Sequence, residues 1–204
     1  MGIQKERMIN QELYLADDDE LKKARKKAKV LIRKFNSADE EHKKYRLQLI
    51  KELFKNTGKN YYIEPPFRVD YGFNMSIGEN FYANYDCIFL DIAPIKIGDN
   101  VLLGPRVGLY TAGHPVDSVI RNQGFEYGKS ISIGNNVWIG GNAIINPGVS
   151  IGNNVIIGSG SIVTKNIPNN VIAVGNPCHV LRKITVEDKK YWEHTRNRYL
   201  SDVE

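Results

Sequence analysis

The sequence IGNNVWIGGNAIINPGVSIGNNVIIGSGSIV, residues 133–163, places an aliphatic side chain at every sixth position. The next residue in most units is glycine or another small or turn-forming residue. A period of six fits neither an α-helix nor an amphipathic strand, but it is typical of a solenoid of short flat strands joined by tight turns. Three units make one triangular coil, so we predict a mainly β, prism-shaped solenoid. The side chains that stack inside it belong to Ile133, Ile139, Ile145, Ile151, Ile157 and Val163.

The repeat is interrupted upstream of this stretch. It begins imperfectly near Ile77, changes phase through Ala93–Lys96 and ends at His114. Residues 115–130 lack the repeat and contain one proline and two glycines. We predict that this segment is a loop projecting from one edge of the prism, a place where repeat scaffolds commonly bind ligands.

Helical segments flank the repeats. One helix is expected to begin near Asp18 and a second at Ser37, because SADE at residues 37–40 has the capping-box pattern. A final helix is expected from Thr185, with Asp188 in the same arrangement. Both segments should cover the open ends of the solenoid, where aliphatic side chains would otherwise face water. The predicted organisation is a helical capping segment (1–60), the solenoid (61–183) with its loop (115–130), and a C-terminal helix (184–204).

Composition narrows the class of protein. The chain has 204 residues, a formal net charge of +5 and two cysteines, too few for a disulfide framework. It shows no apolar leader and no run long enough to span a bilayer, so we expect a cytoplasmic protein with no membrane partner. The lysines of the first helix lack interleaved aromatic residues or a known reading motif. A solvated helix face is therefore favoured over nucleic-acid binding.

His114 is the strongest candidate for chemistry. It lies directly before the interruption of the repeat, so its ring should point outward at the edge of the prism. Two interpretations are open: a loop residue bound to its own backbone, or a general base, for which imidazole is suited at neutral pH. His42 and His194 lie in charged helices and are expected to be solvated.

Metal and cysteine chemistry are disfavoured. A zinc site like that of the hexad-repeat carbonic anhydrases needs three converging histidines, and no second histidine lies within the repeats before His179. Cys87 falls at a small-residue position of the repeat, which favours burial, and Cys178 has no base with an orienting partner. We therefore expect no metal and no covalent enzyme intermediate.

Several strings of the chain together resemble a known family. They are NFYANYD (80–86), IGDNV (97–101), YTAGHPVD (110–117), residues 133–154 and GSIVTKNIPNNVIAVGNPC (160–178). With LYLADDDEL (13–21), they resemble the maltose and galactoside O-acetyltransferases, hexapeptide-repeat enzymes that use acetyl-CoA. The resemblance covers nearly the whole chain and leans toward the maltose-like branch. It implies a left-handed parallel β-helix with a short C-terminal helix, and a homotrimer with sites between subunits.

The resemblance also implies residue roles. His114 would be the general base that takes a proton from a sugar hydroxyl, typically at position 6, and Glu126 would orient its ring. Asn84 would bind the acceptor and steer His114, and a backbone N–H of the Gly140–Gly141 turn would stabilise the oxyanion. Small residues would let the pantetheine arm approach the backbone, and cations would meet the phosphates. The implied coenzyme contacts are Gly141, Ser159, Thr164, Lys165, His179 and Arg182.

Some positions differ from the galactoside branch. Ala16 stands at an acceptor-binding Asp with Asp17 beside it, and Ile92 stands at another with Asp91 beside it. Asp70 replaces a Ser, and His179 replaces a coenzyme-binding Arg. The acceptor-site candidates are therefore Asn84, Asp17, Asp70 and Asp91, and the preferred sugar stays open.

Two other functions compete with sugar acetylation. One is acetyl transfer to a different acceptor, such as serine, an antibiotic or an amino sugar. The other is a non-enzymatic binding or scaffold module. Turnover with a panel of acceptors distinguishes sugar acetylation from acetyl transfer to another acceptor. A rise in Tm on adding coenzyme A would argue against a non-enzymatic scaffold.

Overall fold

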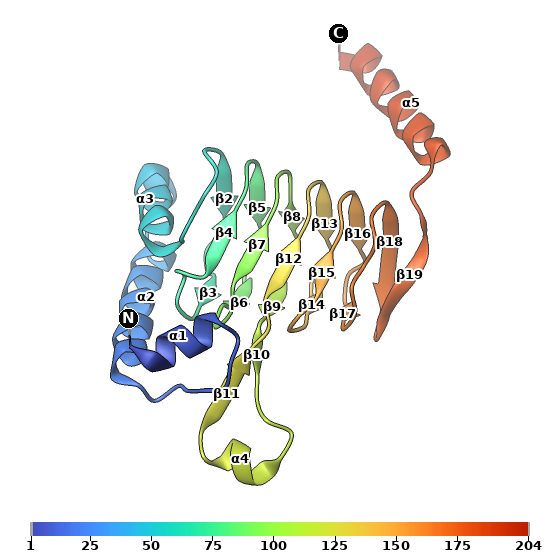
Figure 1. Ribbon diagram of the computed structural model, residues 1–204. Helices are drawn as coiled ribbons and strands as arrows, with labels where there is room; N and C mark the ends of the chain where they lie inside the picture. Colours follow the sequence, from blue (N-terminus) through green and yellow to red (C-terminus); the bar gives the residue numbers. More distant parts are fainter. Residues whose placement is uncertain (1, 204) are drawn as a thin grey trace.

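The computed structural model describes residues 2–203 and shows a triangular β prism with helices at both ends (Figure 1). The elements before the prism are α1 (Ile3–Ile9), β1 (Tyr14–Leu15), α2 (Asp19–Asn36), a 3-10 turn (Glu40–His42) and α3 (Lys43–Leu53). The helix α5 (Val186–Val203) follows the prism. Within residues 2–203, no helix combines the length and the apolar character needed to cross a membrane.

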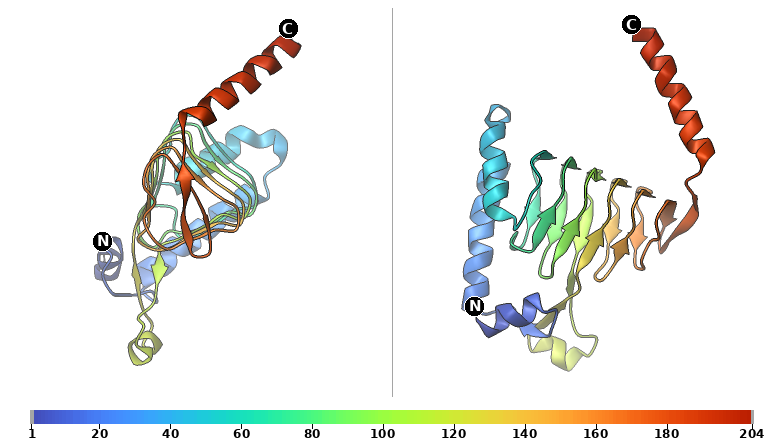
Figure 2. Two further views of the ribbon diagram at one scale, coloured as in Figure 1. Left: turned by 90° about the vertical axis from the view of Figure 1, so that its right-hand side faces the viewer. Right: turned by 45° about the horizontal axis from the view of Figure 1, so that its top comes forward.

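Three sheets form the sides of the prism, which has a triangular cross-section when seen end-on (Figure 2). In each coil the chain passes from the four-stranded to the seven-stranded to the five-stranded sheet. The four-stranded sheet contains β4 (Met75–Ile77), β7 (Ile95–Ile97), β12 (Ile131–Ile133) and β15 (Ser150–Ile151). The seven-stranded sheet contains β2 (Tyr61–Ile63), β5 (Phe81–Ala83), β8 (Leu102–Leu103), β13 (Val137–Ile139), β16 (Val155–Ile157), β18 (Val171–Gly175) and β19 (Cys178–Lys183). The five-stranded sheet contains β3 (Arg68–Val69), β6 (Ile88–Leu90), β9 (Gly108–Tyr110), β14 (Ile144–Ile145) and β17 (Ile162–Val163).

The predicted column of aliphatic side chains is confirmed, and with it the parallel β-helix. Parallel pairing places equivalent positions of successive coils side by side, as in Ile133 beside Ile97 and Ile145 beside Val163. The interior forms one continuous hydrophobic core. The prism begins at β2, as the predicted bounds 61–183 require, although the aliphatic repeat is recognisable only from Ile77. In the first coil the aromatic residues Tyr61 and Phe67 fill interior positions and hide the aliphatic period.

Asparagine builds the corner between the four-stranded and seven-stranded sheets. Asn80, Asn100 and Asn136 adopt left-handed backbone angles with φ of 55°, 56° and 56°, which asparagine tolerates better than most residues. Their side-chain amides also form a ladder, with 2.8 Å from Asn80 to Asn100 and 3.1 Å from Asn100 to Asn136. The last Asn of the IGNN and IGDN strings therefore adopts the backbone angles that the turn needs, and its side chain joins adjacent coils.

The predicted cap at the N-terminal end is confirmed. The ring of Phe67 in the first coil lies 5.1 Å from the ring of Phe35 in α2 and 6.2 Å from the ring of Phe54 after α3. The prediction that the second helix begins at Ser37 is wrong: Ser37 terminates α2, and its N–H donates to the Arg33 carbonyl. The next helical turn begins at Glu40, after Ala38, whose carbonyl accepts a hydrogen bond from the Arg46 guanidinium at 2.7 Å.

The predicted cap at the C-terminal end is wrong for this chain. The last coil is covered by β19, which turns back and pairs antiparallel with β18. The helix α5 projects away from the prism (Figures 1 and 2), and none of its described side chains is buried. Its start does use the predicted capping pair, since the Thr185 N–H donates to the Asp188 carboxylate at 2.8 Å.

The interruption of the repeat forms a hairpin rather than an irregular loop. It consists of β10 (Ala112–Gly113), α4 (Ser118–Asn122) and β11 (Phe125–Gly128), and it projects from one corner of the prism (Figure 1). The N-terminal strand β1 pairs antiparallel with β11 and makes a three-stranded sheet. A segment that starts the chain therefore fixes the position of the hairpin.

Candidate functional site

The proposed coenzyme and acceptor residues fall mainly at two corners of the prism, on opposite edges of the five-stranded sheet. We call the corner before this sheet the glycine corner (residues 84–87, 104–107, 140–143 and 158–161). We call the corner after it the hairpin corner (70–74, 91–94, 111–130, 146–149 and 164–166). These two corners contain most of the candidate residues for binding the coenzyme and the acceptor.

The glycine corner stacks backbone directly on backbone. A Cβ atom at Gly104 would lie 2.5 Å from the Gly141 nitrogen, and one at Gly140 would lie 2.6 Å from the Ser159 nitrogen. The Gly140 N–H donates to the Ile157 carbonyl at 2.8 Å, whereas the Gly141 N–H has no backbone acceptor among residues 2–203. Asn84 and the exposed Ser159 lie at the same corner. The Ser159 N–H likewise has no acceptor among residues 2–203, so this edge offers at least two unengaged amide donors.

The hairpin corner carries His114 and Glu126. His114 directly follows β10 and is exposed. The register pairs Ala112 with Gly128 and Gly113 with Tyr127, so the next step along this ladder places His114 opposite Glu126. Side chains at opposite positions of an antiparallel pair lie on the same face. The geometry therefore favours Glu126 as the neighbour of the His114 ring.

Tyr14 holds Glu126 in place. Its hydroxyl donates to Glu126 Oε2 at 2.8 Å, and its side chain is 1% exposed. Burial and the adjacent Glu126 raise the pKa of the Tyr14 hydroxyl, so it remains a proton donor. The carboxylate of Glu126 is thus positioned from the N-terminal strand β1.

Asp70 and Asp91 also lie at the hairpin corner but in different environments. Asp70 is partly buried, and burial raises the pKa of its carboxyl, opposed by Arg25 and reinforced by Glu126. Asp91 is fully buried, and its carboxylate accepts hydrogen bonds from the backbone N–H groups of Tyr71 (2.8 Å) and Asn74 (3.3 Å). Asp91 is therefore engaged by the loop that follows β3, whereas the Asp70 carboxylate is partly exposed and has no hydrogen-bond partner among residues 2–203.

Asp91→Asn should change how stability depends on pH. Burial raises the pKa of Asp91 to about 7, against about 3.9 in an unfolded chain, so the folded protein holds this proton more tightly. That stabilisation is present at low pH and is lost as the pH rises through 7. The stability advantage of the wild type over Asp91→Asn should therefore shrink by about 2–3 kcal/mol between pH 5 and pH 8, measured by urea unfolding. Equal differences at both pH values would contradict this, and Asp86→Asn at an exposed position is the control.

The other candidates lie farther along the chain or at its ends. Thr164 and Lys165 are exposed at the hairpin corner, two coils beyond the hairpin. Asp17 is exposed and forms an ion pair with Lys22 (2.6 Å). His179 is exposed on β19, with Nδ1 3.3 Å from the Pro177 carbonyl oxygen. Arg182, also on β19, pairs with both oxygens of Asp188 at 2.7 and 2.8 Å.

One chain does not bring all these residues together. Asn84, Gly141 and Ser159 lie at the glycine corner, whereas His114 and Glu126 project from the hairpin corner. The two corners are separated by the width of the five-stranded sheet, about 15–20 Å for five or six extended residues. The hairpin points away from the prism rather than across that sheet (Figure 2).

Two residues that support the site were not predicted. Tyr14 positions Glu126, and Arg25 of α2 binds the Tyr71 hydroxyl and the Ala16 carbonyl (2.7 Å). Arg25 reads in the sequence as one of many basic residues on a charged helix. Tyr14 precedes that helix by a few residues, and nothing local signals its pairing with a strand more than a hundred positions away.

The cysteines are placed as expected. Both are free, and Cys87 is fully buried within the prism. Burial raises the pKa of the Cys87 thiol to about 11, which keeps it protonated and unreactive at neutral pH. Among residues 2–203, no three His, Cys, Asp or Glu side chains cluster as metal ligands would.

Comparison with known proteins places this fold and site in a class. Residues 7–58 match the maltose acetyltransferase hexapeptide capping motif, residues 130–165 match the bacterial transferase hexapeptide repeats, and residues 94–116 match the hexapeptide repeat of succinyl-transferase. These matches define a hexapeptide-repeat protein with the N-terminal cap of the maltose acetyltransferases.

Individual relatives narrow the class further. A galactoside O-acetyltransferase of Escherichia coli is 46% identical over 84% of this chain and 85% of its own. The crystal structure of a maltose O-acetyltransferase from Clostridium difficile superimposes with a TM-score of 0.88 at 52% identity, over 89% of this chain and 97% of that one. A galactoside acetyltransferase in complex with coenzyme A gives a TM-score of 0.89 at 45% identity, over 93% and 94%. The chain belongs to the maltose and galactoside O-acetyltransferase family.

Proposed function

We propose that this protein transfers the acetyl group of acetyl-CoA to a hydroxyl group of a sugar, the 6-hydroxyl being the preferred site. Membership of the family supports the reaction class, and a solved relative binds coenzyme A. The observation that supports the proposal is the hairpin, whose register, extended by one step beyond Gly113–Tyr127, would set the exposed His114 opposite Glu126, and Glu126 accepts a hydrogen bond from Tyr14. A base with an orienting carboxylate is the arrangement that direct attack by a hydroxyl requires.

The proposed reaction proceeds without a covalent enzyme intermediate. His114 removes the hydroxyl proton while the sugar oxygen attacks the thioester carbonyl carbon. The Gly141 N–H, which has no backbone acceptor in the described chain, donates to the oxyanion that forms. The carbon–sulfur bond then breaks, and His114 returns the proton to the departing thiolate. Glu126 stabilises the transient imidazolium. The carboxylate that accompanies a catalytic histidine has this role in other enzymes.

Further residues bind the two substrates. Asp70 at the hairpin corner accepts a hydrogen bond from the sugar, and Asn84 at the glycine corner binds a second hydroxyl. Gly141 and Ser159 flank the pantetheine arm, while Thr164 and Lys165 contact its distal part. His179 and Arg182 on β19 lie toward the phosphates, where Arg182 would exchange or share its partner Asp188.

The separation of the two corners favours a site between subunits. Outward side chains of the four-stranded sheet are polar: Ser76, Lys96, Ser132 and Ser150. Those of the seven-stranded and five-stranded sheets are mostly apolar, including Tyr82, Leu102, Trp138, Ile144 and Ile162. Trp138 is 53% exposed and Leu102 is 48% exposed, and contiguous exposed apolar surface of this kind marks interaction sites. A ring of three prisms would cover the seven-stranded face and the part of the five-stranded face that lies beyond α2, and would bring the hairpin of one chain to the glycine corner of the next.

A panel of acceptors tests the reaction and the substrate class together. With acetyl-CoA and glucosides, maltose or galactosides, we expect release of free thiol well above the rate without acceptor. Serine, amino sugars and hydroxylated antibiotics serve as the competing acceptors, and faster turnover with one of these would replace the sugar. Absence of turnover with every acceptor, together with no rise in Tm on adding coenzyme A, would favour a scaffold protein instead.

A further inference from the structure

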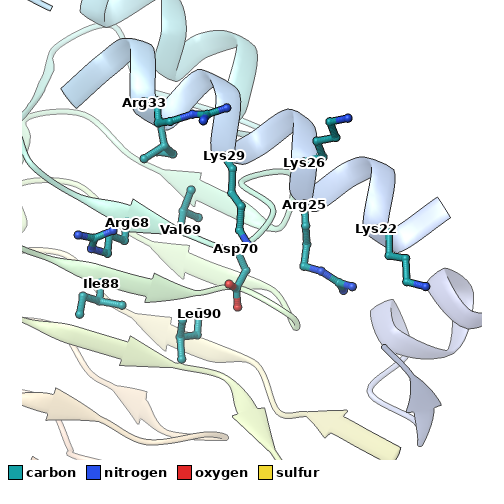
Figure 3. A pocket seen from close by; sticks show the side chains of 11 residues that line it. Lys22, Arg25, Lys26, Lys29, Arg33, Arg68, Val69, Asp70, Ile88 and Leu90 are labelled. Carbon is teal, nitrogen blue, oxygen red and sulfur yellow. The ribbon is translucent and has the colours of Figure 1, made fainter. Parts of the chain in front are cut away.

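A groove lies between α2 and the outer surface of the five-stranded sheet (Figure 3). Its volume is about 710 Å³, within the range of small-ligand sites. The helix contributes one wall, and Arg68, Asp70, Ile88 and Leu90 of the first two strands contribute the other. The N-terminal cap and the prism thus enclose a space that neither forms alone.

The walls of this groove are strongly cationic. Six basic side chains line it with a single carboxylate, that of Asp70: Lys22, Arg25, Lys26, Lys29, Arg33 and Arg68. Lys22 is paired with Asp17, and Arg25 is engaged by Tyr71 and Ala16. Lys26, Lys29, Arg33 and Arg68 form no ion pair among residues 2–203. The helix face is therefore not merely solvated, because five of its basic side chains line one groove together with Arg68.

The groove is continuous with the proposed reaction site. Asp70 lines its inner end, and Figure 3 shows the Lys29 side chain extending from α2 toward Asp70. Asp70 is also close enough to Glu126 for the two carboxylates to interact electrostatically. A sugar held by Asp70 with one hydroxyl toward His114 would direct its remaining substituents along the groove.

We propose that the physiological acceptor is an anionic carbohydrate whose phosphate or carboxylate group binds between Lys29, Arg33 and Arg68. This inference rests on the proposed acetyltransferase function and names its substrate class. Two arginines and a lysine match the oxygens of a phosphate or carboxylate with charge-assisted hydrogen bonds. Ile88 and Leu90 supply the apolar floor on which the sugar ring rests.

The test compares acceptor selectivity in matched variants. Wild type, Lys29→Glu/Arg33→Glu and the control Lys23→Glu/Lys34→Glu, which makes the same charge change on α2 outside this groove, are assayed with three acceptors. These are methyl glucoside, glucose 1-phosphate and glucuronic acid. We expect kcat/KM of the wild type to be at least tenfold higher for one anionic acceptor than for methyl glucoside. The groove variant should lower that ratio tenfold or more, whereas the control variant should keep it.

The two anionic arms distinguish phosphate from carboxylate as the recognised group. A ratio near one in the wild type, or the same ratio in the groove variant, would overturn the proposal. Trimer dissociation of the groove variant in sedimentation, without loss of selectivity, would instead assign the groove to subunit contact and also overturn it.

Direct binding separates this proposal from the proposed function. Calorimetric titration with inorganic phosphate and glucose 1-phosphate requires no turnover. Binding by the wild type and the control, with at least tenfold weaker binding by the groove variant, would support the groove even if no acceptor were acetylated. Equal binding by all three proteins would remove the groove as the anion site even if neutral sugars were acetylated.

Discussion

His114→Ala should lower kcat for acetyl transfer by about 10²–10⁴-fold, the range expected for loss of a general base. The side chain is exposed at the end of β10, and the prism interior does not contain it. The variant should therefore assemble as the wild type does and retain its affinity for coenzyme A. The loss should appear in kcat, because the imidazole accepts the proton in the transition state and contributes little to substrate binding in the ground state.

The matched control for this variant is His194→Ala. His194 is exposed on α5 and distant in sequence from the hairpin, so its loss should leave kcat within about twofold, as for ordinary surface substitutions. An assembled His114→Ala protein with wild-type kcat would remove His114 as the base. The exposed ring would then be the loop residue that the sequence also allows.

Mixed trimers should recover activity that neither parent protein has. His114→Ala disables the hairpin corner, and Ser159→Trp places an indole on the glycine corner where the pantetheine arm would lie. If each site takes one corner from each of two neighbouring chains, random mixing in a closed ring leaves about one quarter of the sites intact. Tandem purification of the co-expressed, differently tagged variants removes both homotrimers, and each remaining mixed trimer has one intact site of its three. The purified mixture should therefore show about one third of wild-type kcat.

The alternative gives a sharply different result. If one chain supplied both corners, every site in the mixture would carry one defect, and activity would stay at the level of the parents. The control is a mixture of His114→Ala with Glu126→Ala chains, whose defects share one corner, and it should stay inactive. Mixing parent trimers after purification, without exchange, should also give no recovery.

The sequence could predict the prism because the same six-residue pattern of aliphatic and turn-forming residues recurs in each coil. Ile133, Ile139 and Ile145 lie on the three sides of one coil, and all three are buried in its interior. The first coil lies inside the predicted bounds but lacks the aliphatic period, because Tyr61 and Phe67 fill equivalent space with aromatic rings that also contact the N-terminal cap. The capping-box pattern at Ser37 puts the second helix three residues too early, because four residues of sequence do not show that Ser37 still ends the preceding helix.

The site could be predicted only in part, for a geometric reason. His114 and Glu126 belong to one hairpin, so their proximity follows from a short stretch of chain. The contribution of Tyr14 depends on pairing between β1 and β11, and the groove depends on α2 lying against the five-stranded sheet. Such contacts join distant segments through the folded shape, and no period or spacing in the sequence encodes them.

The reversal of direction between β18 and β19 matters beyond the last coil. A column of identical parallel rungs presents at its end the same backbone groups that bind each internal rung, which is the template on which fibrils grow. In the seven-stranded sheet, β19 occupies that edge with an antiparallel strand, a register irregularity and the charged side chains of Arg182 and Lys183. At this edge of the seven-stranded sheet, a second prism would not meet the parallel pairing pattern of the internal rungs, and this disfavours growth of the solenoid into a rod.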